Sequence, residues 1–323
     1  MAKELIIMPN WIGDCALALS VVHRKMLMQN ADVTLLIPHH LAQLCAILSG
    51  LPVISWDRNS FREKYKVLRQ IRSLKFNAVY VIPHSFSSAF FSFLTGIKKR
   101  RGVDKELRRF FFTQALPYSL RNRTLHITYE YALVLETDFV PPDYWQGVGI
   151  DKSVEHSGKI IFCPGAMYGK AKQWTGFAKL AQMLPSKKIV VLGDKRDNDI
   201  AVEIHNSAPE NVVNLAGKTD LLEACRIIAG ASVVVSNDSG LMHLAGYCGT
   251  PVIGIFGSTS PLWTRPLGAK AKIASVKCEC SPCLERTCRY KHYACMNLIK
   301  PAHVQQLVSD LIEDSTHNHG RAR

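Results

Sequence analysis

The sequence predicts an α/β protein with two domains, each built on a parallel β-sheet, and three observations support this prediction. The chain has 323 residues, more than a single hydrophobic core usually serves. Short runs of β-forming residues alternate with amphipathic stretches along the whole chain. Several expected strands are continuous apolar runs, which is typical of parallel strands that helices cover on both faces. We therefore expect right-handed crossovers between parallel strands.

The first half of the chain alternates between short apolar runs, expected as strands, and stretches with helical spacing. The expected strands are residues 4–8, 33–37, 53–56 and 78–82. The expected helices are residues 14–29, 41–48 and 61–74. Residues 138–158 contain Pro141, Pro142 and several glycines with little periodicity. We interpret this segment as a linker between a domain of residues 1–150 and one of residues 151–323.

The same alternation restarts after the linker. The expected strands are residues 159–163, 188–192, 212–215, 232–236 and 252–256, and the expected helices are residues 174–183, 198–206, 220–229 and 239–248. Pro301 begins a final helix to about residue 312, because proline suits the first helical turn. We expect the polar tail 314–323 to be disordered. Two such halves in tandem predict a cleft between the domains for a nucleotide and its reaction partner.

Composition limits the location and the partners of the protein. Lys and Arg number 40 against 26 Asp and Glu, and the net charge of +14 favours an anionic partner such as nucleic acid, anionic lipid or a phosphorylated substrate. No apolar run approaches the roughly 20 residues that span a bilayer. The N-terminus lacks the apolar region of a signal peptide, so we expect a cytosolic protein.

The first chemical motif is Pro-Asn-Trp-Ile-Gly-Asp at residues 9–14, between the first expected strand and helix. Ligands of open α/β sheets bind beyond the carboxyl ends of the strands, which is where this loop lies. Gly13 permits close backbone approach, and the Asp14 carboxylate could accept the proton of a sugar hydroxyl. Alternatively, Asp14 is only a helix cap, worth about 1 kcal/mol. The residues alone leave the two interpretations equal.

The second motif is Ser-Asn-Asp-Ser-Gly-Leu-Met-His at residues 236–243, again between a strand and a helix. Backbone N–H groups near Ser239 and Gly240, together with the helix dipole, would form an anion site for a diphosphate. His243 lies one turn into the helix on the same face as Ser239. The alternative is an ordinary capped helix start, which would not require so dense a cluster of Asp, Ser and Gly.

The third motif is Cys-Pro-Gly-Ala at residues 163–166, followed by Lys170, Lys172 and Trp174. Lys172 could neutralise charge that develops on a departing diphosphate. Lysines in loops are usually only solvated, so this motif alone is weak evidence for a site. Its position together with the other two motifs strengthens the prediction. All three motifs follow strand carboxyl ends.

Together these motifs resemble those of the ADP-heptose:lipopolysaccharide heptosyltransferases, the type II enzymes most closely. The resemblance implies a GT-B fold, in which two Rossmann-like domains face each other across a cleft. It implies an enzyme that moves heptose from ADP-heptose to the lipopolysaccharide inner core, with inversion and without a catalytic metal or other cofactor. The acceptor would bind the N-terminal domain and ADP-heptose the C-terminal domain.

The resemblance also assigns roles to individual residues. Asp14 matches the proposed base, and Lys172 matches the diphosphate-binding lysine. The residues that match ADP-binding positions are Asp238, Ser239, Gly240 and His243. The loop of Gly193 and Asp194 would approach the nucleoside, where Asp197 would bind the ribose. Lys172 and the Ser239–Gly240 amides would each stabilise the leaving diphosphate by about 3 kcal/mol.

A basic cluster near residue 100 suggests how an anionic acceptor binds. Seven positive charges, Lys98, Lys99, Arg100, Arg101, Lys105, Arg108 and Arg109, precede three phenylalanines at 110–112. One interpretation is a solvated basic surface. The other is contact with an anionic acceptor and with the cytoplasmic leaflet of the inner membrane, on which the protein would be peripheral.

The acceptor would be the lipid A–inner-core molecule, contacted by Gly13, His84, Ser85, Arg100 and Arg101. We expect no nucleic-acid partner, because no binding motif for one accompanies the charge. We expect a monomer.

Half of the ten cysteines lie within residues 278–295. In a cytosolic protein this favours metal or redox chemistry over structural disulfides. Cys280, Cys283, Cys288 and Cys295 could hold a structural zinc or iron ion in tetrahedral geometry. Only one Cys-x-x-Cys pair is present, so reduced or incidentally oxidised thiols are the alternative.

Other functions remain open from the sequence. They are a type I-like or a protein-modifying heptosyltransferase, a nucleotide-sugar epimerase of GT-B architecture, and a non-catalytic nucleotide-binding protein. An epimerase would need an acid/base pair, and the motif at residues 9–14 offers one carboxylate without an obvious partner.

Overall fold

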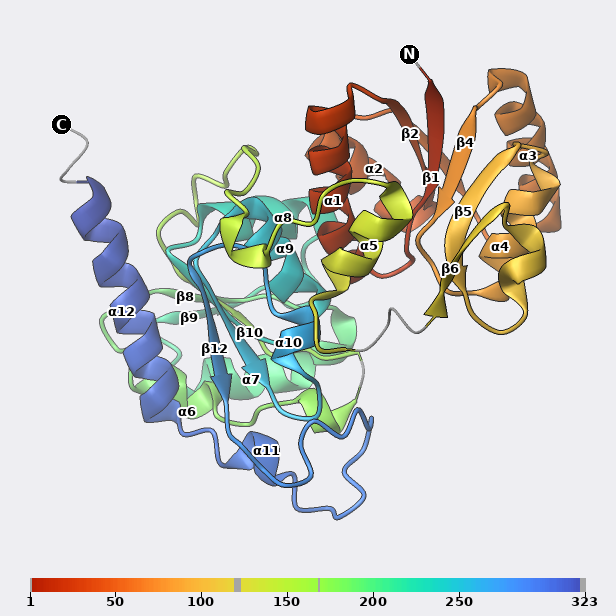
Figure 1. Cartoon of the computed structure of the whole chain (residues 1–323). Coiled ribbons are helices and arrows are strands. Elements are labelled where there is room, and N and C mark those ends of the chain that lie inside the picture. Colours follow the sequence, from red (N-terminus) through yellow and green to blue (C-terminus); the bar gives the residue numbers. More distant parts are fainter. Residues whose placement is uncertain (1, 119–122, 168, 320–323) are drawn as a thin grey trace. The chain divides into compact units, whose positions relative to one another are not determined.

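The computed structural model describes residues 2–118, 123–167 and 169–319 (Figure 1). The chain divides into two compact units, Met1–Pro141 (unit 1) and Pro142–Arg323 (unit 2). Each unit contains one six-stranded sheet, and every strand pair in both sheets is parallel. The expected α/β class with two parallel sheets is confirmed.

Unit 1 alternates strands and helices on a sheet of order β3-β2-β1-β4-β5-β6. Its strands are β1 (Lys3–Ile7), β2 (Asp32–Pro38), β3 (Val53–Trp56), β4 (Ala78–Val81), β5 (Lys99–Asp104) and β6 (Gln114–Pro117). Its helices are α1 (Ile12–Gln29), α2 (His39–Ser49), α3 (Phe61–Leu74), α4 (Phe86–Leu94) and α5 (Ile127–Leu135), with the 3₁₀ turn η1 (Arg108–Phe111). Figure 1 shows α1, α2 and α5 on one face of this sheet and α3 and α4 on the other.

Unit 2 repeats the plan on a sheet of order β12-β11-β10-β7-β8-β9. Its strands are β7 (Ile160–Cys163), β8 (Ile189–Val191), β9 (Val212–Asn214), β10 (Val233–Asn237), β11 (Val252–Phe256) and β12 (Ala271–Ser275). Its helices are α6 (Phe177–Gln182), α7 (Asn198–Ser207), α8 (Leu221–Gly230), α9 (Gly240–Cys248), α10 (Pro261–Thr264), α11 (Ala294–Asn297) and α12 (Pro301–His319). The 3₁₀ turns are η3 (Pro142–Tyr144), η4 (Lys170–Lys172) and η5 (Lys195–Asp197).

Both sheets reverse their strand order beside their first strand. The chain runs β1, β2, β3 in one direction and then returns to place β4 on the other side of β1, and β7 and β10 have the same relation. The register sets Ile7 beside Val81 and Cys163 beside Ser236. The loops after each pair of strands therefore leave the same edge side by side, which is where open α/β sheets bind ligands.

Most expected elements are confirmed with ends within two residues, but two helices differ. The helix expected at 174–183 is only Phe177–Gln182, because the Trp174 N–H donates to the Asn237 side chain at 3.2 Å and draws the chain into a loop. The final helix continues to His319, because the polar residues after 312 include no proline or glycine before Gly320 to stop it. Residues 320–323 lie outside the described residues.

Hydrophobic contacts fix the helix layers to the sheets. On one face of the unit-1 sheet, Val67 and Ile71 of α3 and Ala89 and Phe91 of α4 share a core with residues of β1 and β4. Within the ranges that the structure describes, no helix combines the length and the apolar character needed to cross a bilayer.

Arg108 has a role that the sequence analysis did not predict. Its side chain is fully buried, so its inclusion in a basic surface is wrong. The guanidinium donates to the backbone carbonyl oxygens of Pro83 (2.8 Å), Ser85 (3.1 Å), Lys105 (3.2 Å) and Val103. A buried charge with this many acceptors joins η1 and β5 to the loop after β4.

Replacing Arg108 should therefore destabilise unit 1. We expect Arg108→Met to lower the free energy of unfolding by about 3 kcal/mol, because several buried carbonyl groups lose their donor. The exposed neighbour Arg109 provides the control, and Arg109→Met should change stability by less than about 0.5 kcal/mol. Urea unfolding followed by circular dichroism measures both. Equal stability of the two variants would contradict a structural role for Arg108.

Candidate active site

The loop after β1 places Asp14 in the first turn of α1. The helix begins at Ile12, and Trp11 is the N-cap residue, without a side-chain capping bond. Asp14 is therefore not the helix cap, and that alternative interpretation is wrong. The positive end of the helix dipole favours an ionised carboxylate at this position. The buried Cys15 thiol donates to the Pro9 carbonyl at 3.1 Å and fixes the loop.

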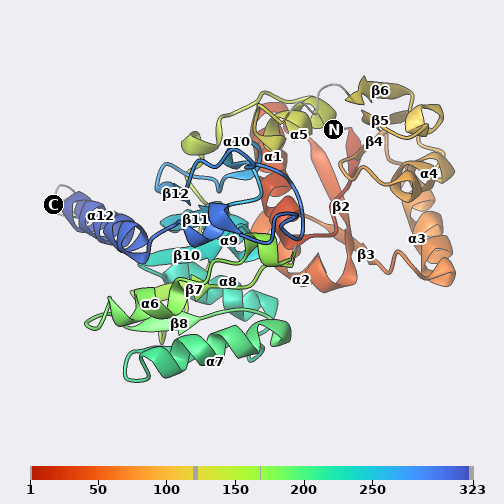
Figure 2. The ribbon, with the colours of Figure 1, turned by 90° about the horizontal axis from the view of Figure 1, so that it is seen from below.

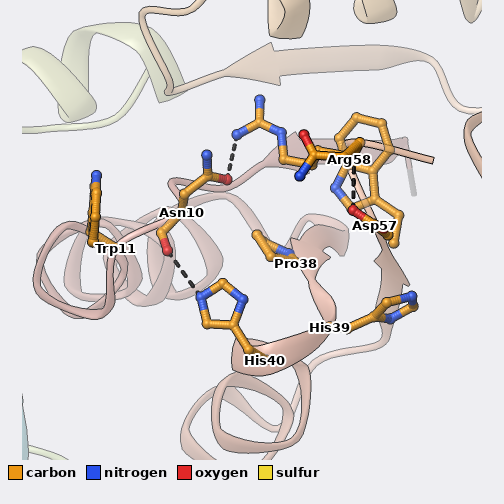
Figure 3. Close-up of a pocket in the computed structure, with 9 residues that line it drawn as sticks. Asn10, Trp11, Pro38, His39, His40, Asp57 and Arg58 are labelled. Carbon is orange, nitrogen blue, oxygen red and sulfur yellow. Dashed lines mark hydrogen bonds between the residues drawn. The ribbon is translucent and has the colours of Figure 1, made fainter. Parts of the chain in front are cut away.

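A cavity of about 420 Å³ lies beside this loop within unit 1 (Figure 3). Its lining comes from the last residues of β2 and β3 and from the segments that follow β1, β2 and β3, all at the carboxyl edge of the sheet. The lining residues are Asn10, Trp11, Pro38, His39, His40, Trp56, Asp57, Arg58 and Asn59. Nitrogen Nε2 of His40 lies 3.2 Å from the Asn10 carbonyl oxygen, so the loop after β1 is joined to the start of α2.

Arg58 is the cationic residue of this cavity, and the sequence analysis missed it. Its guanidinium donates to Asn10 Oδ1 and to Ser88 Oγ, the latter at 2.7 Å, and lies 5.6 Å from the Trp56 ring centre. Burial lowers the pKa of Arg58, although an arginine this basic stays charged. The available signal was its place two residues after the strand expected at residues 53–56, but it lies outside any cluster of basic residues.

The loop after β4 brings Ser85 to Arg58, which lines this cavity, and directs His84 elsewhere. Ser85 caps α4, accepting from the Ser88 N–H, and its hydroxyl lies 3.4 Å from an Arg58 nitrogen. Nitrogen Nε2 of His84 lies 2.6 Å from the buried Glu130 carboxylate of α5. Asn10, Arg58 and Ser85 thus form one polar group at the reversal point between β1 and β4.

Arg100 and Arg101 lie away from the carboxyl edge. They pair in register with Val79 and Tyr80 of β4, in the middle of the sheet. Their guanidinium groups donate to backbone carbonyls: Arg100 to those of Ile97 and Phe111, and Arg101 to that of Leu133. These bonds bind β5 to its neighbours and do not bring either arginine to the Asp14 loop.

In unit 2, Asp238 organises a polar cluster at the corresponding edge. The buried carboxylate accepts from Lys172 Nζ at 2.5 Å and from Thr259 Oγ1 at 2.6 Å, and His243 Nε2 lies 3.7 Å from its other oxygen. Burial alone would raise the pKa of Asp238, but the His243 hydrogen bond and the Lys172 charge lower it to about 2. Asp238 is thus ionised at neutral pH and orients the cationic Lys172.

His243 offers an unsatisfied polar atom in this cluster. Its side chain is buried, and among the described residues its Nδ1 has no hydrogen-bond partner. A buried ring nitrogen without a partner is unusual and marks a position where a ligand group could bond. The sequence analysis predicted His243, whereas Thr259 was missed because it follows a different strand, β11.

Ser239 and Gly240 form the start of α9, as expected. Ser239 is the N-cap residue in an extended conformation, and the helix begins at Gly240. Its hydroxyl lies 3.1 Å from that of Ser236. Backbone N–H groups in the first turn of a helix have no partner within the helix, so this end of α9 can bind an anion.

Two further side chains brace the loops around the cluster. Asn237 donates to the Pro164 carbonyl at 2.6 Å and accepts from the Trp174 N–H at 3.2 Å, which holds the segment containing Lys172 in place. Asp197 accepts from the Asp194 N–H at 2.9 Å. A Cβ atom on Gly165 or Gly193 would overlap the Asp197 carboxylate. Asp197 thus joins the loops after β7 and β8, and burial raises its pKa.

The cysteine-rich segment does not form a recognisable metal centre. Across the described ranges, no three His, Cys, Asp or Glu side chains are arranged to hold a metal ion. Cys288 Sγ lies 4.0 Å from His292 Nδ1. Burial, followed by the nearby thiols, raises the pKa of Cys295 to about 11. Cys280, Cys283, Cys288 and Cys295 are all thiols here.

The chain is similar to heptosyltransferases in both sequence and structure. The family model described as glycosyltransferase family 9 (heptosyltransferase) matches residues 64–294. The lipooligosaccharide heptosyltransferase 2 of Haemophilus influenzae is 30% identical over 83% of this chain and 87% of its own. That of Haemophilus ducreyi is 32% identical over 84% and 88%. The structure of Escherichia coli ADP-heptose lipopolysaccharide heptosyltransferase II covers 97% of this chain and 99% of its own, with 24% identity and a TM-score of 0.83.

The low pKa of Asp238 predicts a defined pH dependence of stability. The pKa of Asp238 in the folded protein lies below the ordinary value of 3.8. The ionised carboxylate therefore stabilises the folded state fully above about pH 4, and this stabilisation is lost as the pH falls toward about 2. Over that interval, the difference in unfolding free energy between wild type and Asp238→Asn should shrink by about 2 kcal/mol. Urea unfolding at a series of pH values measures the difference. A difference independent of pH would contradict the assignment.

Proposed function

Because the chain belongs to glycosyltransferase family 9, the heptosyltransferases, we propose that it transfers heptose from ADP-heptose to the lipopolysaccharide inner core. The observation that carries this proposal is the cluster of Asp238, Lys172 and His243 beside the start of α9. Such a cluster suits a diphosphate that gains negative charge during the reaction. Because the relatives include type 2 heptosyltransferases, we propose the acceptor specificity of the type 2 enzymes.

The donor would bind at the carboxyl edge of the unit-2 sheet. The diphosphate oxygens would accept from the backbone N–H groups at Ser239 and Gly240 and from Lys172, which Asp238 holds in position at 2.5 Å. His243 Nδ1 would bond to the same ligand. Asp197 would lie toward the nucleoside, but its carboxylate already braces two loops, so we propose a positioning role for it.

Asp14 would act as the base on the acceptor side. Its carboxylate would take the proton from an acceptor hydroxyl as that oxygen attacks the anomeric carbon. The bond between that carbon and the diphosphate breaks from the opposite face, so the configuration inverts. Lys172 and the amides of α9 would stabilise the charge on the departing ADP. Gly13, buried beside Asp14, would allow the acceptor to approach the backbone.

We propose that the cavity beside Asn10 and Arg58 receives an anionic group of the acceptor. A guanidinium that is partly withdrawn from water binds carboxylate or phosphate strongly. Ser85 would add a hydroxyl to this site, whereas Arg100 and Arg101 are engaged with backbone carbonyls. The acceptor would be anchored by lipid A, so the protein would work as a peripheral protein on the cytoplasmic leaflet of the inner membrane. We propose that it does so as a monomer.

The proposed transfer assigns no step to the cysteine-rich segment. A structural zinc or iron ion at Cys280, Cys283, Cys288 and Cys295 stays a separate hypothesis. The described residues include no group of three such ligands arranged around one point. Metal analysis of the purified protein tests it.

The central experiment supplies ADP-heptose together with truncated lipopolysaccharides that carry no heptose or one heptose. We expect ADP release and heptose transfer with the one-heptose acceptor. Transfer only to the acceptor without heptose would indicate type I specificity. Conversion of the donor sugar without any acceptor would indicate an epimerase and contradict the proposal.

Asp14→Asn should reduce transfer by about 10³-fold, because the amide cannot accept the proton. ADP affinity should stay unchanged, since the proposed ADP site lies in unit 2. Asp32, which pairs with Lys3 at the amino edge of the same sheet, provides the control, and Asp32→Asn should retain turnover. Steady-state assays and calorimetric ADP titration measure both effects. Unchanged turnover in Asp14→Asn would refute its role as the base.

Lys172→Met should lower kcat/KM by about 100-fold, because a donor to the leaving diphosphate is lost. The exposed Lys170, two residues away in η4, offers a matched control. Lys170→Met removes the same charge and should leave kcat/KM within about twofold of wild type. If both variants lose activity equally, then only the general charge of this loop matters.

A further inference from the structure

Helix α4 presents three phenylalanines to solvent. Phe86, Phe90 and Phe93 follow the i, i+4, i+7 spacing of one helical face and are 52%, 42% and 47% exposed. The opposite face, with Ala89 and Phe91, is buried against the sheet. The helix has no charged residue. Amphipathic helices of soluble domains normally point their polar side outward, whereas α4 buries Ser88 and Ser92 and exposes its phenylalanines.

The exposed phenylalanines form part of a larger apolar patch. Phe111 of η1 lies 5.1 Å from Phe86, 5.4 Å from Phe90 and 5.9 Å from Phe93, measured between ring centres. Its neighbour Phe110 is 78% exposed. A contiguous exposed patch of this kind marks an interaction surface, unlike apolar residues scattered singly.

Helix α3 supplies positive charge next to this patch. It carries five Lys and Arg residues against a single acidic one, Glu63. Arg62, Lys66 and Arg69 are exposed and share one helical face. Glu63 lies 2.7 Å from His39, and with one acidic residue against five basic ones the helix keeps a formal net charge of +4.

The two helices are neighbours in one layer. Both α3 and α4 contribute side chains to the core on the same face of the unit-1 sheet. Arg72 of α3 donates to the Leu94 carbonyl at the end of α4, at 2.7 Å. Figures 1 and 2 both show the helices side by side. The layer therefore exposes an aromatic strip and a cationic strip together, which we call the α3–α4 surface.

We propose that the α3–α4 surface docks on an anionic lipid bilayer. The phenylalanines would enter the boundary between headgroups and acyl chains, while the α3 cations would pair with anionic headgroups. A protein partner that covered only the aromatic strip would leave the cationic strip without a role, and nucleic acid would use the cations but not the phenylalanines. An anionic membrane matches both halves.

The surface is continuous with the proposed acceptor cavity. Ser85, which caps α4, lies 3.4 Å from the cavity residue Arg58, and Phe86 is the next residue along the chain. A molecule with an acyl anchor in the bilayer would thus meet the cavity at the edge of the docked surface. This inference rests on the proposed function for its biological purpose, but docking itself needs no substrate.

The test measures binding of the full chain to vesicles without donor or acceptor. The probes are vesicles of phosphatidylethanolamine with phosphatidylglycerol, and neutral vesicles of phosphatidylcholine alone. We expect cosedimentation with the anionic vesicles to be at least about tenfold stronger. The variant Phe86→Ser/Phe90→Ser/Phe93→Ser should lose at least about tenfold of that binding.

A charge variant tests the second strip independently. Lys66→Glu/Arg69→Glu should weaken binding to anionic vesicles by at least about tenfold. The control Lys179→Glu/Lys187→Glu makes the same net-charge change at exposed residues of unit 2 and should bind like wild type. Circular dichroism verifies folding, and transfer to a lipid-free core oligosaccharide should be unchanged in the Phe variant.

Several outcomes would overturn the proposal. One is equal vesicle binding by wild type and both surface variants. Another is a wild-type dimer in sedimentation velocity that the Phe variant abolishes, since a second copy would then cover the strip. Absence of wild-type transfer to either truncated lipopolysaccharide, with vesicle binding intact, would instead refute the proposed function alone.

Discussion

Parallel strands end at a common edge of their sheet, and this constraint determines where the candidate catalytic and binding side chains of the molecule lie. In each unit the chain reverses direction across the sheet beside its first strand, so the segments after two adjacent strands leave the same edge side by side. Asp14 and Ser85 lie in the segments that follow β1 and β4 in unit 1, and Lys172 and Asp238 lie in those that follow β7 and β10 in unit 2. Segments that are distant in the sequence lie close together at this edge because the strands that precede them are paired in the sheet.

Loops at this edge lack the hydrogen-bond ladders of strands and helices, and single buried polar side chains replace those ladders. Asn237 joins two loops by its two amide atoms, and the Arg108 guanidinium joins three segments. Because these groups are already satisfied by protein atoms, the loops are fixed before any ligand arrives. Preorganised donors of this kind cost little reorganisation during a reaction.

The sequence was sufficient to predict features that depend on local pattern. Apolar runs identified most strands of both sheets, but β5, β6 and β12, which are short or carry charged residues, were not predicted. Asp14 and Asp238 were recognised because each follows an apolar run. Features that depend on distant partners were not predictable. Arg108 looks like a surface cation until its carbonyl partners are seen, and Arg58 is unremarkable until Asn10, 48 residues earlier, is found beside it. Arg108 has a structural role and Arg58 lines a cavity, and this difference depends on burial and on distant partners, which a count of charged residues cannot reveal.

The carboxylate of Asp197 fills the space that side chains at Gly165 and Gly193 would need. These three positions are therefore not independent as the sequence diverges. A larger residue at either glycine would be admitted only after position 197 had become smaller, and a smaller residue at 197 would remove the capping bond to Asp194. The order in which changes accumulate would decide whether intermediates fold, so this corner of the sheet restricts the mutational routes open to the protein.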